Sequence, residues 1–197
     1  MGSLNRCWDT DNQFYIDYHD NEWGVPTTDD RTLFEFLILE GAQAGLSWET
    51  ILNKREAYRA AYKGFDPETV ASFDDEDVSR LLADSGIVRN RRKIASSIRN
   101  ARCFLDIQEE FGSFSKFIWQ FVGGRPIVHA FSTYDDVPTY TQEAQHMSKE
   151  LKKRGFSFVG PTICYAFMEA VGLVNDHLTH CFRYDEIKSQ FKDFKAF

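Results

Sequence analysis

Two cysteines and two histidines near opposite ends of the chain have the side-chain types of a metal site. Cys7 and His19 lie close to the N-terminus, and His177 and Cys181 are four residues apart, on one face of a helical turn. Four such ligands around one centre would form a closed tetrahedral zinc site, which stabilises a fold and leaves no position for water. The spacing also fits two buried cysteines beside unrelated histidines, and His180 is a rival ligand.

The stretch "YHDNEWGVP", residues 18–26, places stacking and titrating groups side by side. Tyr18 and Trp23 flank an imidazole and two carboxylates. A hydrophobic core needs aromatic rings, but it does not need charged groups beside them. The composition of this stretch therefore indicates a functional site as well as core packing.

A carboxylate follows an apolar run in "LEGAQAGLSW", residues 39–48. Glu40 continues a helix that faces the core, and Trp48 comes after a turn at Gly45. A buried carboxylate is costly unless it has a partner or a task. If Glu40 is buried beside indole rings and Gln43, it suits a flat, electron-poor ligand with N–H donors. The alternative is a helix edge at which Glu40 faces solvent.

Two basic stretches could bind phosphate although the formal net charge of the protein is −7. That charge argues against nucleic-acid binding over the whole surface but leaves room for a local basic face. Residues 81–98 predict a helix, a glycine-containing turn and a second helix, whose turn amides and basic side chains could hold a phosphate. The alternative is an ordinary helical hairpin with a solvated basic face. The candidate DNA contacts in this hairpin and in the basic stretch 152–154 are Gly86, Arg89, Arg91, Lys93 and Lys153.

Helical periodicity dominates the elements that must position these groups. The apolar spacing and the capping residues predict helices at 30–44, 48–62, just after Asp66-Pro67, up to Gly86, and at 90–110, 113–121, 143–153 and 161–171. Residues 123–142 have no clean period and are expected to form a long loop. No strand alternation persists, so the predicted class is all-α. We expect one domain in two lobes over 1–181, followed by a C-terminal tail or short helix at 182–197.

Bulk composition sets the broad class of protein. A hydrophobic fraction of 43% over 197 residues is enough for a sizeable core. No apolar run approaches the ~18 residues of a membrane span, and no apolar segment of a secretory signal follows Met1. Four cysteines without a tight pattern indicate reduced thiols or metal ligands. These features predict a cytoplasmic protein with no membrane partner, and we expect a monomer.

Four blocks of the chain, taken in order, resemble the 3-methyladenine DNA glycosylase I family. The blocks are "YHDNEWGVP", "LEGAQAGLSW", "KKRGFSFVGPTICY" and "GLVNDH", and the likeness runs from about residue 6 to residue 181. This family is a branch of the helix-hairpin-helix glycosylases. The resemblance implies an all-α fold and a monofunctional enzyme that hydrolyses the N-glycosidic bond of 3-methyladenine in alkylated double-stranded DNA, leaving an abasic site.

The resemblance also implies roles for individual residues. A structural zinc, the family's only metal, would join the N- and C-terminal segments, and Glu40 would be the carboxylate of the pocket. Cys7 and Trp8 are adjacent here, whereas the family usually has one residue between them, so the position of Trp8 depends on the next loop. The implied zinc ligands are Cys7, His19, His177 and Cys181. The implied stacking residues are Trp8, Tyr15, Tyr18, Trp23 and Trp48.

The chemistry implied by this family needs little acid catalysis. Methylation at N3 makes adenine a cation with a labile glycosidic bond, and the base leaves as a neutral molecule. The enzyme must turn the nucleotide out of the duplex, recognise the extrahelical base and leave room for water. Electron-rich aromatic faces favour a cationic base, and an ionised Glu40 would accept hydrogen bonds from its N–H edge. No lysine accompanies Glu40 in the pocket blocks, so lyase chemistry is not expected.

Two other functions remain open from the sequence. An inactive homologue could hold methylated bases without cleaving them. Alternatively, a zinc-stapled helical interaction module would use all of its aromatic residues as core, and it would then have no cavity of ligand size.

Overall fold

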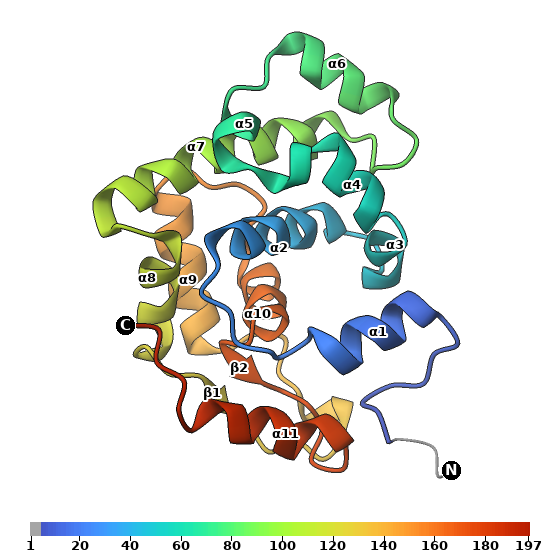
Figure 1. The fold of residues 1–197 in the computed structure, drawn as a ribbon, viewed down its shortest axis with the longest axis vertical. Helices are drawn as coiled ribbons and strands as arrows, with labels where there is room; N and C mark the ends of the chain where they lie inside the picture. The colour runs from blue at the N-terminus through green and yellow to red at the C-terminus, as the bar shows by residue number, and fades with distance from the viewer. Residues whose placement is uncertain (1–4) are drawn as a thin grey trace.

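The computed structural model describes residues 5–197, and it consists mainly of α-helices (Figure 1). Residues 1–4, which include most of the segment inspected for a secretory signal, lie outside the described part. Within residues 5–197, no helix is both long and apolar enough to cross a membrane. The helices are α1 (Gln13–Asn21), α2 (Asp30–Gln43), α3 (Trp48–Leu52), α4 (Arg55–Ala61), α5 (Pro67–Ala71), α6 (Asp75–Ala83), α7 (Arg91–Phe111), α8 (Phe114–Trp119), α9 (Gln142–Lys153), α10 (Pro161–Ala170) and α11 (Phe182–Phe191).

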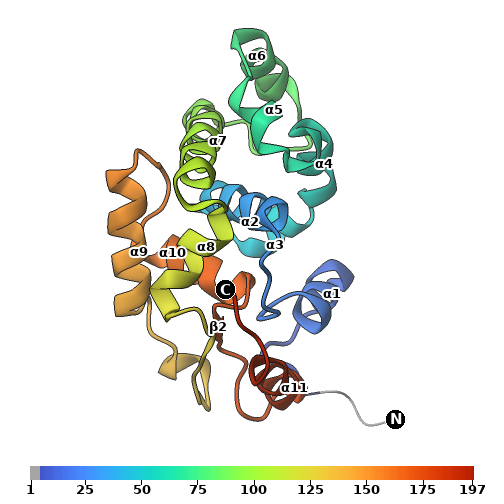
Figure 2. The ribbon, with the colours of Figure 1, turned by 60° about the vertical axis from the view of Figure 1, so that its left-hand side comes forward.

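Helix α2 runs through the middle of the molecule and packs against α3, α7, α8 and α10 (Figures 1 and 2). Asp29 caps its N-terminus by accepting a hydrogen bond from the amide of Thr32 at 2.8 Å. Every residue from Leu33 to Ala42 is buried, so the helix is enclosed on all sides. This placement draws the two glutamates of the helix, Glu35 and Glu40, into the interior.

The upper part of the molecule in Figure 1 contains α4 to α7. Helices α6 and α7 are joined by a short turn, which confirms the predicted helical hairpin. Asn90 caps α7 by accepting hydrogen bonds from the amides of Arg92 and Lys93. At its other end α7 stops at Gly112, whose φ of 82° is the left-handed conformation that glycine adopts without strain.

The sequence predicts one helix over 48–62, and this prediction is wrong in one respect: the structure has two helices in this range. Ser47 caps α3 as expected, but α3 ends at Leu52 and α4 begins at Arg55. The side-chain amide of Asn12 contacts Asn53 Oδ1 at 3.0 Å and so ties the start of α1 to this break. Asparagine is a weak helix former that competes for backbone hydrogen bonds, which explains why the helix is interrupted there.

The expected loop at 123–142 contains some regular structure, although the fold as a whole is helical, as predicted. Strand β1 (Ile127–Val128) pairs in parallel with β2 (Val174–Asn175), with Ile127 opposite Val174. A 3₁₀ turn, η3 (Tyr134–Asp136), lies further along the same segment. Two-residue strands are too short to produce a visible alternation of apolar and polar residues, which is why the sequence pattern did not predict them.

The C-terminal segment forms a helix that packs on the rest of the fold. Tyr184, Ile187 and Phe191 of α11 are buried, and beyond the helix the ring of Phe194 lies 4.6 Å from that of Trp119. Of the two forms expected for residues 182–197, the structure has the short helix. Figure 1 shows α11 running below β2 and the chain end returning towards α8.

Candidate functional site

The four predicted metal ligands come together in the structure. Their ligand atoms all lie within 4.8 Å of one another, and all four residues are buried. Cys7 Sγ is 3.5 Å from His177 Nδ1, and Cys181 Sγ is 3.5 Å from both His177 Nδ1 and His19 Nε2. A tetrahedron built with zinc–nitrogen and zinc–sulfur bonds of ~2.0–2.3 Å has edges of roughly 3.5 Å. The donor set and its spacing therefore fit a zinc ion.

The surroundings of the cluster orient each imidazole towards the centre. Asp20 Oδ1 lies 2.7 Å from His19 Nδ1, and the Asp20 carboxylate also accepts two hydrogen bonds from Arg6. Because Nδ1 of His19 bonds to Asp20, its Nε2 faces the cluster. His177 Nε2 bonds to the carbonyl of Trp23 at 3.0 Å, which turns its Nδ1 inward. Outer partners of this kind fix the ring orientation of metal-binding histidines.

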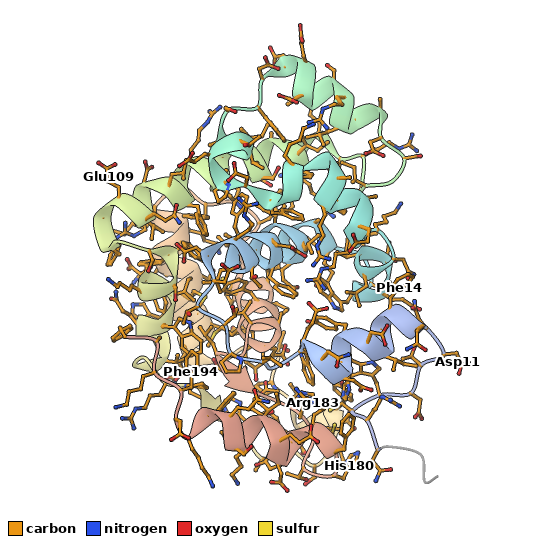
Figure 3. All side chains as sticks on the ribbon, viewed as in Figure 1. Asp11, Phe14, Glu109, His180, Arg183 and Phe194 are labelled. Atoms are coloured by element: carbon orange, nitrogen blue, oxygen red, sulfur yellow. The ribbon has the colours of Figure 1, made fainter. Side chains whose placement is uncertain are left out.

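The cluster is also electrostatically suited to a cation. Hydrogen bonds from the Cys7 thiol and from both imidazoles lower the pKa of Cys181, which favours its thiolate, while the hydrogen bond to Cys181 and burial raise the pKa of Cys7. All four cysteines of the chain are free thiols. The rival ligand His180 is exposed and lies at the outer edge of the molecule in Figure 3, which excludes it from the cluster.

Beside the Cys/His cluster lies a cavity of about 180 Å³ whose walls are mostly aromatic. It has room for one purine ring system. Larger hollows elsewhere are open and shallow, such as one of about 720 Å³ at α9 that lacks stacking rings apart from an imidazole. The residues that line the cavity are Trp8, Tyr15, Tyr18, Trp23, Glu40, Gln43, Trp48, Tyr134, Ala166 and Glu169.

Four segments distant in sequence supply the walls. Tyr15 and Tyr18 are three residues apart on one face of α1, and Glu40 and Gln43 have the same relation on α2. Between α2 and α3 the chain reverses at Gly45, whose φ is 78°, and this turn places Trp48 at the start of α3. The structure therefore brings every predicted pocket residue to one cavity.

Trp8 lines the cavity even though it directly follows Cys7. Its ring centroid lies 4.9 Å from that of Tyr15 and 5.0 Å from that of Trp23. A T-shaped contact at 4.7 Å joins it to His19. Trp8 thus reaches the cavity with the short Cys7–Trp8 spacing of this chain.

Glu40 differs sharply from the other buried glutamate of α2. Glu35 accepts a hydrogen bond from Arg55 at 2.6 Å and forms a second ion pair with Arg59. Glu40 is only 2% exposed, and its Oε2 has no hydrogen-bond partner within the described residues. Burial raises the pKa of Glu40 to about 8. The alternative of a solvent-facing Glu40 is therefore excluded, and near neutral pH its carboxyl is mostly protonated when no cation is close.

Two indole N–H groups of the same cavity share this lack of partners. Trp8 Nε1 and Trp48 Nε1 are buried without a hydrogen-bond acceptor in the described part of the chain. Buried polar atoms are almost always bonded in folded proteins, so each exception needs an explanation. Two donors and one acceptor without partners around one aromatic cavity are explained by a flat ligand with polar edges.

The sequence interpretation missed three lining residues, Tyr134, Ala166 and Glu169. Tyr134 comes from the segment 123–142, which has no period that could have placed it. Glu169 had a usable signal, because it interrupts the apolar run "FMEAVGL" just as Glu40 interrupts its own. Ala166 lies three residues before Glu169 on the same face of α10.

Some of the predicted DNA contacts are exposed to solvent, whereas others already form hydrogen bonds within the protein. Arg89, Arg91 and Lys153 are exposed. Lys93 Nζ instead donates to the carbonyls of Ala42 and Ala44, both at 2.7 Å. Its ammonium group therefore stabilises the C-terminal end of α2 and does not face outward.

Gly86 also has a structural role in the hairpin turn. Its amide donates to Asp84 Oδ1 at 2.7 Å, so this N–H is not free for a phosphate. A Cβ at this position would lie 2.7 Å from Cβ of Ala57. The glycine thus allows the turn of the hairpin to pack closely against α4.

Comparison with known proteins identifies the family. A family model described as methyladenine glycosylase matches residues 8–184, nearly the whole chain. The chain belongs to the methyladenine glycosylase family. The match covers all ten residues that line the aromatic cavity and three of the four residues of the metal cluster.

Two curated members of the methyladenine glycosylase family are close relatives. The DNA-3-methyladenine glycosylase 1 of Escherichia coli (strain K12) is 52% identical over 179 residues, which cover 90% of this chain and 96% of the relative. The DNA-3-methyladenine glycosylase of Haemophilus influenzae (strain ATCC 51907 / DSM 11121 / KW20 / Rd) is 48% identical over 177 residues, covering 89% and 96%.

A solved structure shares the fold of the chain. The 3-methyladenine DNA glycosylase I of Staphylococcus aureus, in a study of the structural basis of 3-methyladenine recognition, superposes with a TM-score of 0.89 at 41% identity. The alignment covers 93% of this chain and 98% of that one. The arrangement of helices in Figure 1 is therefore that of this glycosylase.

Proposed function

We propose that this protein removes 3-methyladenine from alkylated double-stranded DNA by hydrolysing its N-glycosidic bond, which leaves an abasic site. Its relatives at 52% and 48% identity carry this activity in their names. The observation on this chain that carries the proposal is the buried Glu40 carboxyl, whose Oε2 has no hydrogen-bond partner among residues 5–197 and which lines an aromatic cavity of about 180 Å³.

Recognition of a cationic base is the main task of the cavity. The electron-rich faces of Trp23 and the tyrosines of α1 attract the positive charge of N3-methylated adenine. That charge also favours the ionised form of Glu40, whose carboxylate accepts hydrogen bonds from the amino edge of the base. The unpartnered indole N–H groups donate to ring nitrogens, and the amide of Gln43 adds a further polar contact.

Departure of the base needs little help from a proton donor. The glycosidic bond of the cationic nucleotide breaks to release a neutral base, and water then attacks C1′. The cavity holds no lysine among its lining residues, so an imine between enzyme and sugar is not formed. The protein thus acts as a monofunctional hydrolase that lowers the barrier by binding the extruded nucleotide.

Contact with DNA is assigned to the hairpin of α6 and α7, which we interpret as the helix-hairpin-helix motif. Arg89 and Arg91 lie exposed at its turn and at the start of α7. Lys153, exposed at the end of α9, extends the basic surface. These cations would bind phosphates without reading sequence, which suits an enzyme that searches for damaged bases.

A structural zinc is the metal that the cluster would hold. Cys7 and His19 from the N-terminal segment and His177 and Cys181 before α11 would be its ligands. Zinc supplies folding stability in such closed sites and takes no part in the reaction. Trp8 follows one ligand directly, so the site also fixes one wall of the base cavity.

The alternative of an interaction module with a solid aromatic core does not fit the cavity. The remaining alternative is a reader that binds methylated bases without cleaving them. Chromatography of bases released from DNA treated with a methylating agent separates the two functions. We expect free 3-methyladenine and an equal number of abasic sites. Binding of the free base without release would support the reader, and an absence of both would refute the proposed function.

A further inference from the structure

A second carboxyl group, that of Glu169, lines the base cavity together with that of Glu40. Glu169 lies on α10, which packs directly against α2, so each of two neighbouring helices contributes one glutamate to the same cavity. Ala166, one turn earlier on α10, lines the cavity as well, so one face of α10 forms a wall. Glu169 is partly buried and its neighbours in the chain, Met168 and Ala170, belong to the core.

The charges around Glu169 are all of one sign. None of the ten residues that line the cavity is a lysine, arginine or histidine. Burial and the negative charges of Asp176 and Glu40 raise the pKa of Glu169 well above its ordinary value. No basic side chain forms an ion pair with Glu169 within residues 5–197, in contrast to Glu35. A carboxyl in this position is costly unless something positive approaches it.

Asp176, the acidic neighbour of Glu169, is already occupied by other partners. It accepts a hydrogen bond from the hydroxyl of Tyr165, and its Oδ1 lies 2.6 Å from His129 Nδ1. Both carboxylate oxygens of Asp176 therefore already have hydrogen-bond partners other than Glu169.

We propose that Glu169 is a second specificity residue of the base cavity, which acts with Glu40 to select a positively charged purine over its neutral parent. This inference rests on the proposed function. The aromatic walls alone stack on any purine, and their preference for a cation is worth only ~0.5–2 kcal/mol. A second carboxyl in the lining of the cavity adds selection by charge, because a cation that enters favours the ionised form of each carboxyl.

A purely structural role for Glu169 predicts different behaviour. If its only task were to share a proton with Asp176, its replacement by the neutral glutamine would change the stability of the fold and the binding of all purines alike. A specificity residue instead changes the ratio between charged and neutral ligands. This ratio is therefore the decisive quantity.

The ratio can be measured with two small ligands of nearly equal shape. The 3,9-dimethyladeninium ion carries a permanent charge, and 9-methyladenine is its neutral parent. Binding of each to the zinc-loaded protein is followed by quenching of tryptophan fluorescence, since three tryptophans line the cavity. The matched control is Glu109→Gln, which removes the same charge from the outer edge of α7, far from α1 and α3 (Figure 3).

We expect the wild-type protein to bind the cation more tightly than 9-methyladenine, and Glu169→Gln to lower this preference about tenfold, the scale of one charge-assisted hydrogen bond. Glu109→Gln should leave the preference unchanged. An unchanged ratio in folded Glu169→Gln overturns the inference. If that variant does not fold, Glu169→Asp withdraws the carboxyl by one methylene group and should also lower the ratio; an unchanged ratio there overturns the inference equally.

Failure of this inference is distinguishable from failure of the proposed function. Release of 3-methyladenine from methylated DNA by the wild-type protein tests the function, without reference to Glu169. Base release with an unaltered ligand ratio in the Glu169 variants would refute only the inference. Absence of base release would refute the function.

Discussion

Replacement of Glu40 by glutamine gives a graded test of how the cavity recognises its base. The two side chains have nearly the same shape, but glutamine stays neutral at every pH. Ionising Glu40 at pH 7 costs about 1.4 kcal/mol, since its pKa is about 8 and each tenfold step corresponds to that energy. A hydrogen bond to a charged group contributes ~1.5–3 kcal/mol. The net advantage of wild type over Glu40→Gln is therefore small at pH 7 and larger above pH 8.

The expected pH dependence follows from the direction of the pKa shift. The carboxylate becomes available as the pH rises through about 8, so wild-type affinity for a permanently cationic purine should rise up to that pH and then level off. The phenols of Tyr15 and Tyr18, which face Glu40 from α1, stay neutral over this range because burial raises their pKa, and burial with the charge of Asp176 raises the pKa of Glu169 on α10. Glu40→Gln should lack this rise, with a loss of up to about tenfold at pH 7 and about a hundredfold at pH 9.

The same replacement should stabilise the protein when no base is bound. A carboxyl whose pKa is raised by burial destabilises the folded state above its unfolded pKa, and this cost grows until the pH passes about 8. Glu40→Gln should therefore raise the melting temperature, more at pH 8.5 than at pH 5, by a few degrees for each kcal/mol at this chain length.

Fluorescence titration with the cationic purine, base release from methylated DNA and thermal melts across pH 5–9 provide the readouts. Equal affinities of the two proteins over this range would refute a direct role of Glu40 in binding. Complete loss of turnover with base binding intact would show instead that Glu40 activates the attacking water.

Three further predictions concern the metal, the DNA surface and the hairpin turn. Metal analysis should find one zinc per folded chain, and Cys181→Ala should lower both zinc content and melting temperature; folded wild-type protein without zinc would contradict the assignment. Arg89→Ala and Lys153→Ala should each weaken DNA binding at all sequences and reduce its salt dependence, as measured by fluorescence anisotropy, and unchanged binding in both would place the DNA surface elsewhere. Gly86→Ala should lower stability by ~1–3 kcal/mol in urea unfolding because its Cβ would meet Ala57 at 2.7 Å, and an unaltered midpoint would show that the turn can relax.

Helix positions were predictable from the sequence because their signals are local. Asp29, Ser47 and Asn90 cap α2, α3 and α7, and each accepts a hydrogen bond from an amide two or three residues ahead. The pairing of β1 with β2 joins segments almost fifty residues apart through only two residues of each, so no local pattern could reveal it.

The candidate site was predictable to the extent that residue type limits what a side chain can do. A carboxylate in an apolar run pointed to Glu40, and the same rule would have found Glu169 if it had been applied to α10. Lys93 was assigned to DNA because of its basic neighbours. Its contact with the end of α2 depends on tertiary packing across about fifty residues, which the sequence does not display.

The contact between the two ends of the chain has a consequence for the order of folding. Cys7 reaches a partner 170 residues later, and its neighbour Trp8 forms a wall of the base cavity. Contacts of such separation form late because a long loop must close first. On the ribosome, the N-terminal wall cannot be anchored until residues 177–181 have left the exit tunnel. The base cavity is therefore completed only when the segment at 177–181 has joined the N-terminal one.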